Sequence, residues 1–341
     1  MKIGVIGASG YSGGELLRLL IGHPHFEIEY IAAGTQAGSL ITQVHPQLTA
    51  LAGRNFEGTE ISRMNECDLL FFALPHGESA KYITQIDPTI KVVDLGADFR
   101  LESAQAWQKY YGGEHAGSWV YGLPEIPGQR EKIEAATRVA NPGCYATSIA
   151  LAAAPALQAG VIDGGDIVVV AASGTTGAGR KAATNLLASE IMGSLTSYKF
   201  GGVHQHTPEI EQTLQLLSTE DVKISFTPIL APMPRGILAT VTAKLKSKVD
   251  TNFVHELYES FYSNEQFVSV LAQSQLPKTS AVIGGNGVQI QVAVDEHTDR
   301  LIVSAVLDNL GKGAASQAIQ NANLISGFPE NTGLTVNGIG S

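Results

Sequence analysis

The sequence predicts an α/β protein built from a Rossmann-type, doubly wound parallel sheet and a second, α+β domain with a largely antiparallel sheet. Short apolar runs alternate with helical stretches in the first half, which is typical of a parallel sheet. Runs of alternating polarity in the second half favour antiparallel strands. The length of 341 residues also exceeds what one hydrophobic core serves, so two domains are expected.

The first domain is predicted to begin with a buried strand over Lys2–Gly7 and a helix over Gly14–Leu20, separated by a glycine-rich turn. Further strands are expected at Phe26–Ala33, Asp68–Leu74, Val92–Leu95 and Val139–Ala140, with a helix at Glu78–Ile86. Pro142 and Gly143 form a turn that cannot be helical, and an Ala- and Leu-rich helix follows from Cys144.

The second domain is predicted to span residues 144–312, leaving 1–143 to the first. Its expected strands are Asp166–Ala172, Val222–Leu230, Gly236–Leu245, Gly287–Val294 and Arg300–Leu307, the last two joined by a hairpin at Asp295–Asp299, with a helix at Thr251–Ser263. The C-terminal segment 313–341, which opens with the helical stretch Gly313–Ile325, is expected to pack back on the first domain. Cys144 then falls at the junction of two intimately joined domains.

Composition narrows the class of partner. The chain is 44% hydrophobic and 16% charged with a net charge of −10, which argues against a nucleic-acid or anionic-membrane partner and leaves a small-molecule ligand. Two cysteines give no disulfide framework and fit a reducing compartment. The apolar runs are too short to span a bilayer, and the opening strand leaves no room for a signal peptide, so a cytoplasmic protein is expected.

A dinucleotide site is predicted at the glycine-rich turn. Its three glycines lie between a strand and a helix, where the backbone can approach a pyrophosphate and the helix N-terminus binds its charge; the alternative is a plain tight turn. The second strand runs into Gly34-Thr35 with no acid to repel a 2′-phosphate, which favours NADP over NAD, although no obvious Arg or Lys follows to hold that phosphate. The expected cofactor contacts are Gly7, Ser9, Gly10, Tyr11, Ser12, Gly13 and Thr35.

Cys144 is the candidate nucleophile. At the first turn of a helix, unpaired N–H groups and the helix dipole lower a thiol pKa and favour the thiolate. The alternative is a small buried cysteine, which is how the apolar run around Cys67 is interpreted.

His204 and His206 lie two residues apart before a predicted helix, and in an extended segment both would point to one face. A zinc site would need a third ligand, and none stands out, so no metal is expected. An acid/base partner for Cys144 is favoured instead. His206 is preferred, because it abuts the helix that begins near Pro208 and should be held more rigidly; His204 would then orient the thioester or the substrate.

Two further segments offer anion contacts. The loop from Ser173 to Arg180 supplies hydroxyls, backbone N–H groups and a cation; a plain surface loop is the alternative. Arg235 lies between two strand-like runs, where its fork could grip a carboxylate or phosphate with two bonds. A nicotinamide site, an activated cysteine, a base and these anion contacts together fit the reductive opening of an acyl phosphate through a thioester.

The chain resembles the N-acetyl-gamma-glutamyl-phosphate reductases, of the semialdehyde dehydrogenase superfamily, over essentially its whole length. The matching stretches are GASGYSGGELLRLL (Gly7–Leu20), DLGADFRL (Asp94–Leu101), YGLPE (Tyr121–Glu125), NPGCYAT (Asn141–Thr147), SGTTGAGR (Ser173–Arg180), HQHTPEI (His204–Ile210) and PMPRGIL (Pro232–Leu238). The cysteine and arginine motifs are highly specific, because sister aspartate-semialdehyde dehydrogenases have different residues around both.

The resemblance implies NADPH-dependent, reversible reduction of N-acetyl-L-glutamyl 5-phosphate to N-acetyl-L-glutamate 5-semialdehyde and phosphate, a step of arginine biosynthesis. It carries over Cys144 as the nucleophile, both histidines as acid/base partners and Arg235 as a substrate contact; Asn141, Ser173 and Arg180 are the other substrate contacts expected from the matching motifs. Gln205 departs from the family, which usually has arginine there, and Thr176 replaces a more usual serine.

Alternatives remain at this point. The substrate could be aspartyl phosphate or a lysine-pathway analogue, or the chain could be a non-catalytic NADP(H)-sensing protein. A cysteine hydrolase has no use for the glycine turn. A sheet domain of this kind often buries its outer face between copies, so a homodimer or homotetramer is expected.

Overall fold

A computed structural model describes residues 1–340 of the chain. The chain forms two compact units. Unit 1 comprises Met1–Pro142 and Ala314–Leu334. Unit 2 comprises Gly143–Gly313 and the described residues from Thr335 onward. The cut after Pro142 makes Cys144 the second residue of unit 2.

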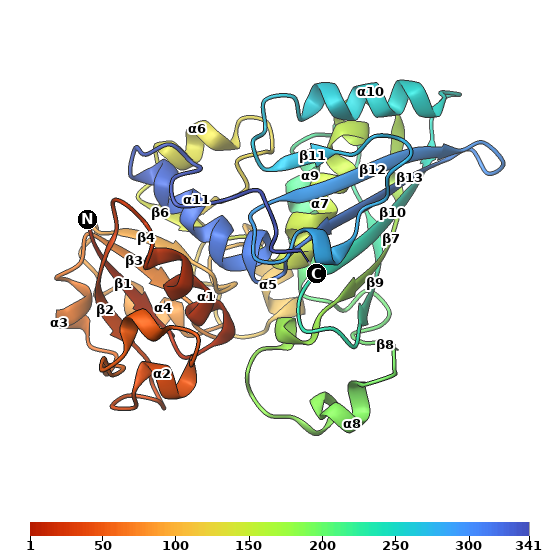
Figure 1. Cartoon of the computed structure of the whole chain (residues 1–341). Coiled ribbons are helices and arrows are strands. Elements are labelled where there is room, and N and C mark those ends of the chain that lie inside the picture. The colour runs from red at the N-terminus through yellow and green to blue at the C-terminus, as the bar shows by residue number, and fades with distance from the viewer. Residues whose placement is uncertain (341) are drawn as a thin grey trace. The chain divides into compact units, whose positions relative to one another are not determined.

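Unit 1 carries a six-stranded sheet in the order β2-β1-β3-β4-β6-β5, all of it parallel. Its strands are β1 (Lys2–Ile6), β2 (Glu27–Ala32), β3 (Leu69–Phe72), β4 (Lys91–Asp94), β5 (Val120–Tyr121) and β6 (Arg138–Ala140). Its helices are α1 (Tyr11–Leu20), α2 (Ile41–Val44), α3 (Ile61–Met64), α4 (Ser79–Ile83), α5 (Ala104–Tyr110), α6 (Gln129–Glu134) and α11 (Ser316–Ile325). The predicted Rossmann-type sheet is confirmed (Figure 1).

Apolar strands explain this sheet. All four residues of β3 are buried, as the central place of the strand requires. Leu69 and Phe71 share a hydrophobic core with the leucines of α1, whereas Leu70 and Phe72 belong to a second core. Helix α1 begins three residues earlier than expected, directly after Gly10, so that Gly13 and Gly14 lie within its first turns and not in the loop before it.

Unit 2 carries a seven-stranded sheet in the order β11-β12-β13-β10-β7-β9-β8. Its strands are β7 (Ile162–Ser173), β8 (Thr196–Ser197), β9 (Ile224–Leu230), β10 (Ile237–Leu245), β11 (Val268–Val270), β12 (Val288–Asp295) and β13 (Arg300–Leu307). Four neighbouring pairs are antiparallel, whereas β7–β9 and β11–β12 are parallel, so the predicted second sheet is mixed and mostly antiparallel.

Helices α7 (Cys144–Gln158), α9 (His206–Gln215) and α10 (Thr251–Phe261) cover one face of this sheet, whereas α8 (Ala188–Ile191) lies on an exposed arm (Figure 1). Helix α7 is buried along its length and contains Pro155, which cannot donate to the carbonyl of Leu151. The hydroxyl of Tyr262 donates to that carbonyl at 2.5 Å. A tyrosine from α10's end thereby replaces the missing backbone bond.

The C-terminal segment divides between the units. Helix α11 lies in unit 1, where the amide of Asn321 donates to the carbonyl of Gly122 at 2.9 Å and to Asn141 at 3.0 Å. The chain beyond Leu334 instead belongs to unit 2, in contrast to the expectation that all of 313–341 packs on the first domain. Backbone pairing explains the return, since Asn286 donates to Thr335 and Ile339 donates to Ile283.

Candidate active site

The glycine turn of unit 1 is built for close backbone approach. Gly7 has φ +83°, and a Cβ there would lie 2.3 Å from the carbonyl oxygen of Ala73. A Cβ on Gly13 would lie 2.6 Å from Cα of Ala8. Helix α1 begins at Tyr11, and its N-cap, Gly10, supplies no side-chain hydrogen bond. The turn therefore fits a pyrophosphate at the N-terminus of α1, as the motif predicts.

The ribose of the cofactor is expected to lie at the end of β2, beside Thr35. Thr35 is exposed and no acid follows directly in the sequence. The structure does bring one acid there from elsewhere, because Glu57 pairs with Ala32 and accepts the N–H of Ala33 at 3.0 Å through its backbone. Its carboxylate accepts a hydrogen bond from Arg63 at 3.2 Å. Nothing in the sequence indicated this acid, because Glu57 is far from β2 along the chain and is brought to it only by folding.

Cys144 is the first residue of α7, as predicted. Its side chain is half-buried, and the N-cap residue, Gly143, donates its N–H to the buried carboxylate of Glu209 at 2.6 Å. A Cβ on Gly313 would lie 2.7 Å from Cβ of Cys144, so Gly313, in the π-helical turn Gly311–Ala315, lies directly against Cys144. Neither Glu209 nor Gly313 was predicted.

The second cysteine has the opposite environment. Cys67 is 4% exposed, and burial raises the pKa of its thiol to about 11. It remains a protonated core thiol at neutral pH, which supports Cys144 as the reactive cysteine.

The two histidines do not lie in an extended segment. His206 begins α9, and Gln205 before it already has helical backbone angles, so the expected extended segment is not formed. The two imidazole rings nevertheless lie together, with a centroid distance of 4.8 Å. Nδ1 of His204 accepts the backbone N–H of His206 at 3.1 Å, which satisfies one of the unpaired donors of the helix start. Burial, followed by the neighbouring His206, lowers the pKa of His204 to about 2. His204 is neutral at physiological pH.

Tyr145 connects the two motifs. Its ring lies edge-on to both His204 and His206, with centroid distances of 5.4 and 6.1 Å. The hydroxyl of Tyr198 donates to that of Tyr145 at 3.3 Å. Burial raises the pKa of both phenols, that of Tyr198 to about 12, so both stay protonated. Tyr145, the residue after Cys144, therefore packs directly against both histidines.

The loop after β7 differs from the expected anion cradle. The N–H groups of its residues 174–176 donate to the carbonyls of Gly236, Met233 and Pro234. These donors are therefore hydrogen-bonded to the neighbouring turn and do not point at an anion. Ser173 is buried and Arg180 is exposed. The loop holds the Pro232–Gly236 turn in place.

Arg235 lies in that turn, with its side chain 20% exposed. Its Nε and Nη2 donate to the two carboxylate oxygens of Asp308 at 3.0 and 2.5 Å. Asn309 accepts the N–H of Gly236 and donates to the hydroxyl of Thr176. Asp308 and Asn309 were not predicted, although both follow the last strand directly, a place where polar side chains commonly serve sites.

Asn141 and Asp94 are both buried within unit 1 and hydrogen-bonded to other groups of that unit. The amide of Asn141 is fully buried, donates to Ala314 and accepts from Asn321. Asp94 is fully buried in unit 1 and accepts hydrogen bonds from Ser79 and Gly96, and burial raises the pKa of its carboxyl to about 7. A substrate contact at Asn141 stays a prediction.

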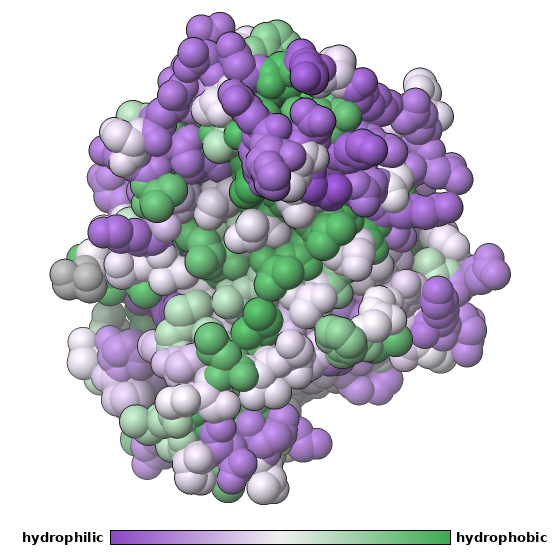
Figure 2. Space-filling view, turned by 90° about the vertical axis from the view of Figure 1, so that its right-hand side faces the viewer, coloured by the Kyte–Doolittle hydropathy of each residue, from purple (hydrophilic) through white to green (hydrophobic). Residues whose placement is uncertain are grey.

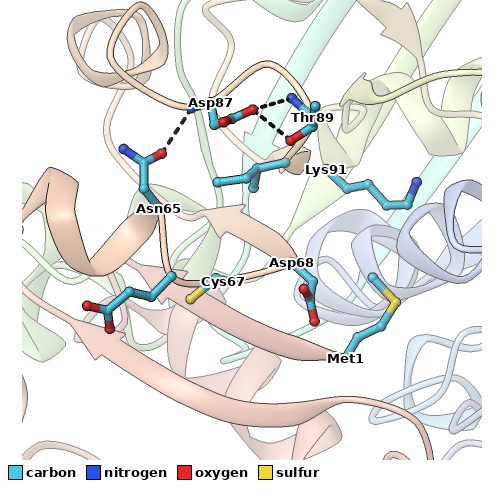
Figure 3. Close-up of a pocket in the computed structure, with 9 residues that line it drawn as sticks. Met1, Asn65, Cys67, Asp68, Asp87, Thr89 and Lys91 are labelled. Atoms are coloured by element: carbon cyan, nitrogen blue, oxygen red, sulfur yellow. Dashed lines mark hydrogen bonds between the residues drawn. The ribbon is translucent and has the colours of Figure 1, made fainter.

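A pocket of about 570 Å³ opens elsewhere in unit 1, at the amino ends of β1, β3 and β4 (Figure 3). Asp87 there accepts hydrogen bonds from both the N–H and the hydroxyl of Thr89. In open parallel sheets ligands bind beyond the carboxyl ends of the strands, so this pocket is not the dinucleotide site. Among residues 1–340 no group of side chains that could hold a metal ion is found, and no helix is long and apolar enough to cross a membrane.

Comparison with known proteins gives the family. Residues 2–136 match the family described as semialdehyde dehydrogenase, NAD binding domain, and residues 144–309 match semialdehyde dehydrogenase, dimerisation domain. An N-acetyl-gamma-glutamyl-phosphate reductase from Acidothermus cellulolyticus is 54% identical, covering 99% of this chain and 98% of the relative. One from Thermobifida fusca is 49% identical over 98% of both.

Solved structures agree at the level of the fold. Aspartate semialdehyde dehydrogenase II from Vibrio cholerae superposes with a TM-score of 0.71 at 16% identity, covering 95% of this chain and 98% of that one. The Candida albicans aspartate semialdehyde dehydrogenase, solved with NADP, gives 0.69 at 16% identity, covering 96% and 99%. The resemblance drawn from the motifs is confirmed: this chain belongs to the N-acetyl-gamma-glutamyl-phosphate reductases, a family of the semialdehyde dehydrogenases.

Proposed function

We propose that the chain reduces N-acetyl-L-glutamyl 5-phosphate with NADPH to N-acetyl-L-glutamate 5-semialdehyde and phosphate, reversibly, in arginine biosynthesis. One observation carries the proposal: a half-buried cysteine begins a buried helix in a chain about half identical to reductases of that name. The presence of that cysteine and both histidines argues against a non-catalytic sensor.

The thiolate of Cys144 attacks the acyl carbon, the C–O bond to phosphate breaks, and phosphate leaves with the electron pair, giving a thioester. Phosphate needs no proton to leave. The histidine therefore acts elsewhere: it takes the proton of the thiol and protonates the oxygen of the thiohemiacetal that forms later. The glycine turn would hold the pyrophosphate of NADPH, and the bound cofactor would supply the hydride that reduces the thioester to a thiohemiacetal. When the thiohemiacetal collapses, the histidine takes its hydroxyl proton, the C–S bond breaks, the aldehyde is released and the thiolate is restored.

Substrate choice is tested in the reverse direction. Phosphate-dependent reduction of NADP⁺ is measured side by side with N-acetylglutamate semialdehyde and with aspartate semialdehyde. We expect turnover with the first and little with the second. A preference for aspartate semialdehyde would assign the chain to the sister enzymes, and no turnover with either would overturn the reductase assignment.

NADPH is expected to be preferred over NADH, because no acid follows β2 in the sequence to repel the 2′-phosphate and the nearby Glu57 carboxylate is held by Arg63. The measurement is kcat/KM for both cofactors. The matched variant Glu57→Gln should change the ratio little. If NADH is preferred by the native chain and Glu57→Gln reverses that preference, Glu57 holds the ribose and the prediction is wrong.

Arg235→Lys is expected to lower kcat/KM for the acyl phosphate by about tenfold or more, or about 1.4 kcal/mol. Lysine keeps the charge but loses the planar fork that meets Asp308 with two bonds and can present a fixed edge to an anion. NADPH affinity should stay unchanged in a direct titration. Unchanged kinetics would make Arg235 a structural residue and move the anion contacts to Arg180, Lys181 or Lys199.

The sheet of unit 2 presents an open face suited to self-association, and we propose a homodimer or homotetramer. Val168 and Val170 of β7, Leu238 of β10 and Ile302 of β13 are exposed on it. Figure 2 shows hydrophobic side chains gathered across this side of the molecule. Light scattering on the purified chain decides between the two assemblies.

We also propose a cytoplasmic location, since the reactive thiol needs a reducing compartment.

A further inference from the structure

His45 is a buried histidine that the proposed chemistry does not use. It follows α2 directly and is 4% exposed. Its Nε2 lies 2.9 Å from the carbonyl oxygen of Ala8, which belongs to the glycine turn. A carbonyl oxygen accepts only, so Nε2 carries the proton and donates it. His45 is thus hydrogen-bonded to the backbone of the dinucleotide turn from a segment 37 residues away.

The backbone of His45 is itself held on both sides. Its N–H donates to Ile41 at 2.8 Å, and its carbonyl accepts from Leu48 at 3.0 Å. The ring of Phe56 lies edge-on to the imidazole at a centroid distance of 6.2 Å. These backbone hydrogen bonds and the ring contact therefore fix the position of the imidazole beside the glycine turn.

Gly14 supplies an independent observation. A Cβ at this position would lie 2.4 Å from Cε1 of His45, so the imidazole occupies the space beside the first turn of α1. This glycine is needed for the ring and not for its own backbone, because no positive φ is recorded for it. The turn and the histidine are thus fitted to each other at two points, the carbonyl of Ala8 and Cα of Gly14.

The hydrogen bond to Ala8 sets the orientation of one peptide. The N–H groups of Gly7 and Ala8 donate to the carbonyl of Ala32, and that of Gly10 donates to Gly7. In a planar trans peptide the C=O and the N–H point in opposite directions. A carbonyl of Ala8 held toward His45 therefore directs the N–H of Ser9 away from it.

We propose that His45 is a positioning residue for the cofactor: by holding the Ala8–Ser9 peptide, it keeps the glycine turn in the form that receives the pyrophosphate of NADPH. The proposal rests on the proposed use of NADPH. His45 contacts the turn, and its effect on the cofactor passes through the backbone of Ala8 and Ser9.

The test is a direct fluorescence titration of NADPH with His45→Leu and His45→Gln. Leucine removes the donor, and we expect Kd for NADPH to rise by about tenfold, the scale of one net hydrogen bond. Glutamine can place an amide N–H near the former Nε2, so it should recover most of the affinity. Acylation of Cys144 by the acyl phosphate without NADPH should proceed at the native rate in both variants.

His255→Leu is the matched control. His255 is 7% exposed, and its Nε2 lies 2.8 Å from the carbonyl of Leu271 in unit 2, so its loss removes the same kind of bond away from the glycine turn. It should lower the melting temperature without changing Kd for NADPH. If His45→Leu does not fold, Gly14→Ala displaces the ring by its new methyl and should weaken NADPH binding in the same way.

The outcomes distinguish failure of the role proposed for His45 from failure of the proposed use of NADPH. Native-like NADPH affinity in His45→Leu or, failing that, in Gly14→Ala overturns the role of His45, as does an equal loss in His255→Leu. A native chain that binds no NADPH overturns the proposed function and the role of His45 with it.

Discussion

Replacement of Cys144 by serine is expected to abolish turnover while leaving NADPH binding intact. The residue begins α7, where the N-terminal end of the helix stabilises a thiolate, whereas a serine hydroxyl would not ionise there at neutral pH. Steady-state rates and an NADPH titration on the same preparation give the two results.

Covalent capture makes the same prediction sharper. Mass spectrometry of the native chain mixed with acyl phosphate, without NADPH, should show one acyl group on Cys144. Cys67→Ser is the matched control and should still be acylated, because the pKa of that buried thiol is raised to about 11. An adduct on Cys67, or none at all, contradicts the thioester mechanism.

Loss of the acid/base histidine is expected to lower kcat by about 10²–10⁴. We propose His206 for this role, because burial lowers the pKa of His204 to about 2 and Nδ1 of His204 already accepts the N–H of His206. His206→Ala should therefore show the larger loss. The alkylation rate of Cys144 as a function of pH, measured in His206→Ala and His204→Ala, reports which ring affects the thiol; a raised thiol pKa in His204→Ala alone reverses the assignment.

His204 also gives a pH signature of its own. Its pKa is lowered on folding from the ordinary 6.5, so the unfolded chain takes up the proton first. The contribution of His204 to stability is present above pH 6.5 and is lost as the pH falls from there toward 2. Unfolding of His204→Ala, followed as a function of pH, should lack this part of the acid dependence.

Local patterns determined much of the fold. The apolar runs of β1 and β3, the glycine turn and the turn at Pro142 each act over a few neighbouring residues, and burial follows from the side chains themselves. The same locality placed Cys144 at a helix start and identified the family by its motifs. The alternating strands of β12 and β13 likewise predicted their antiparallel hairpin.

Only the tertiary structure decided which polar groups meet. Arg235 and Asp308 are 73 residues apart, Gly143 and Glu209 are 66 apart, and no periodicity joins either pair. The loop after β7 illustrates the limit: its residues suit an anion, yet the adjacent turn takes the N–H groups of residues 174–176. Hydrophobic burial depends on each side chain's own character, whereas a hydrogen bond needs a partner that folding alone brings within 3 Å.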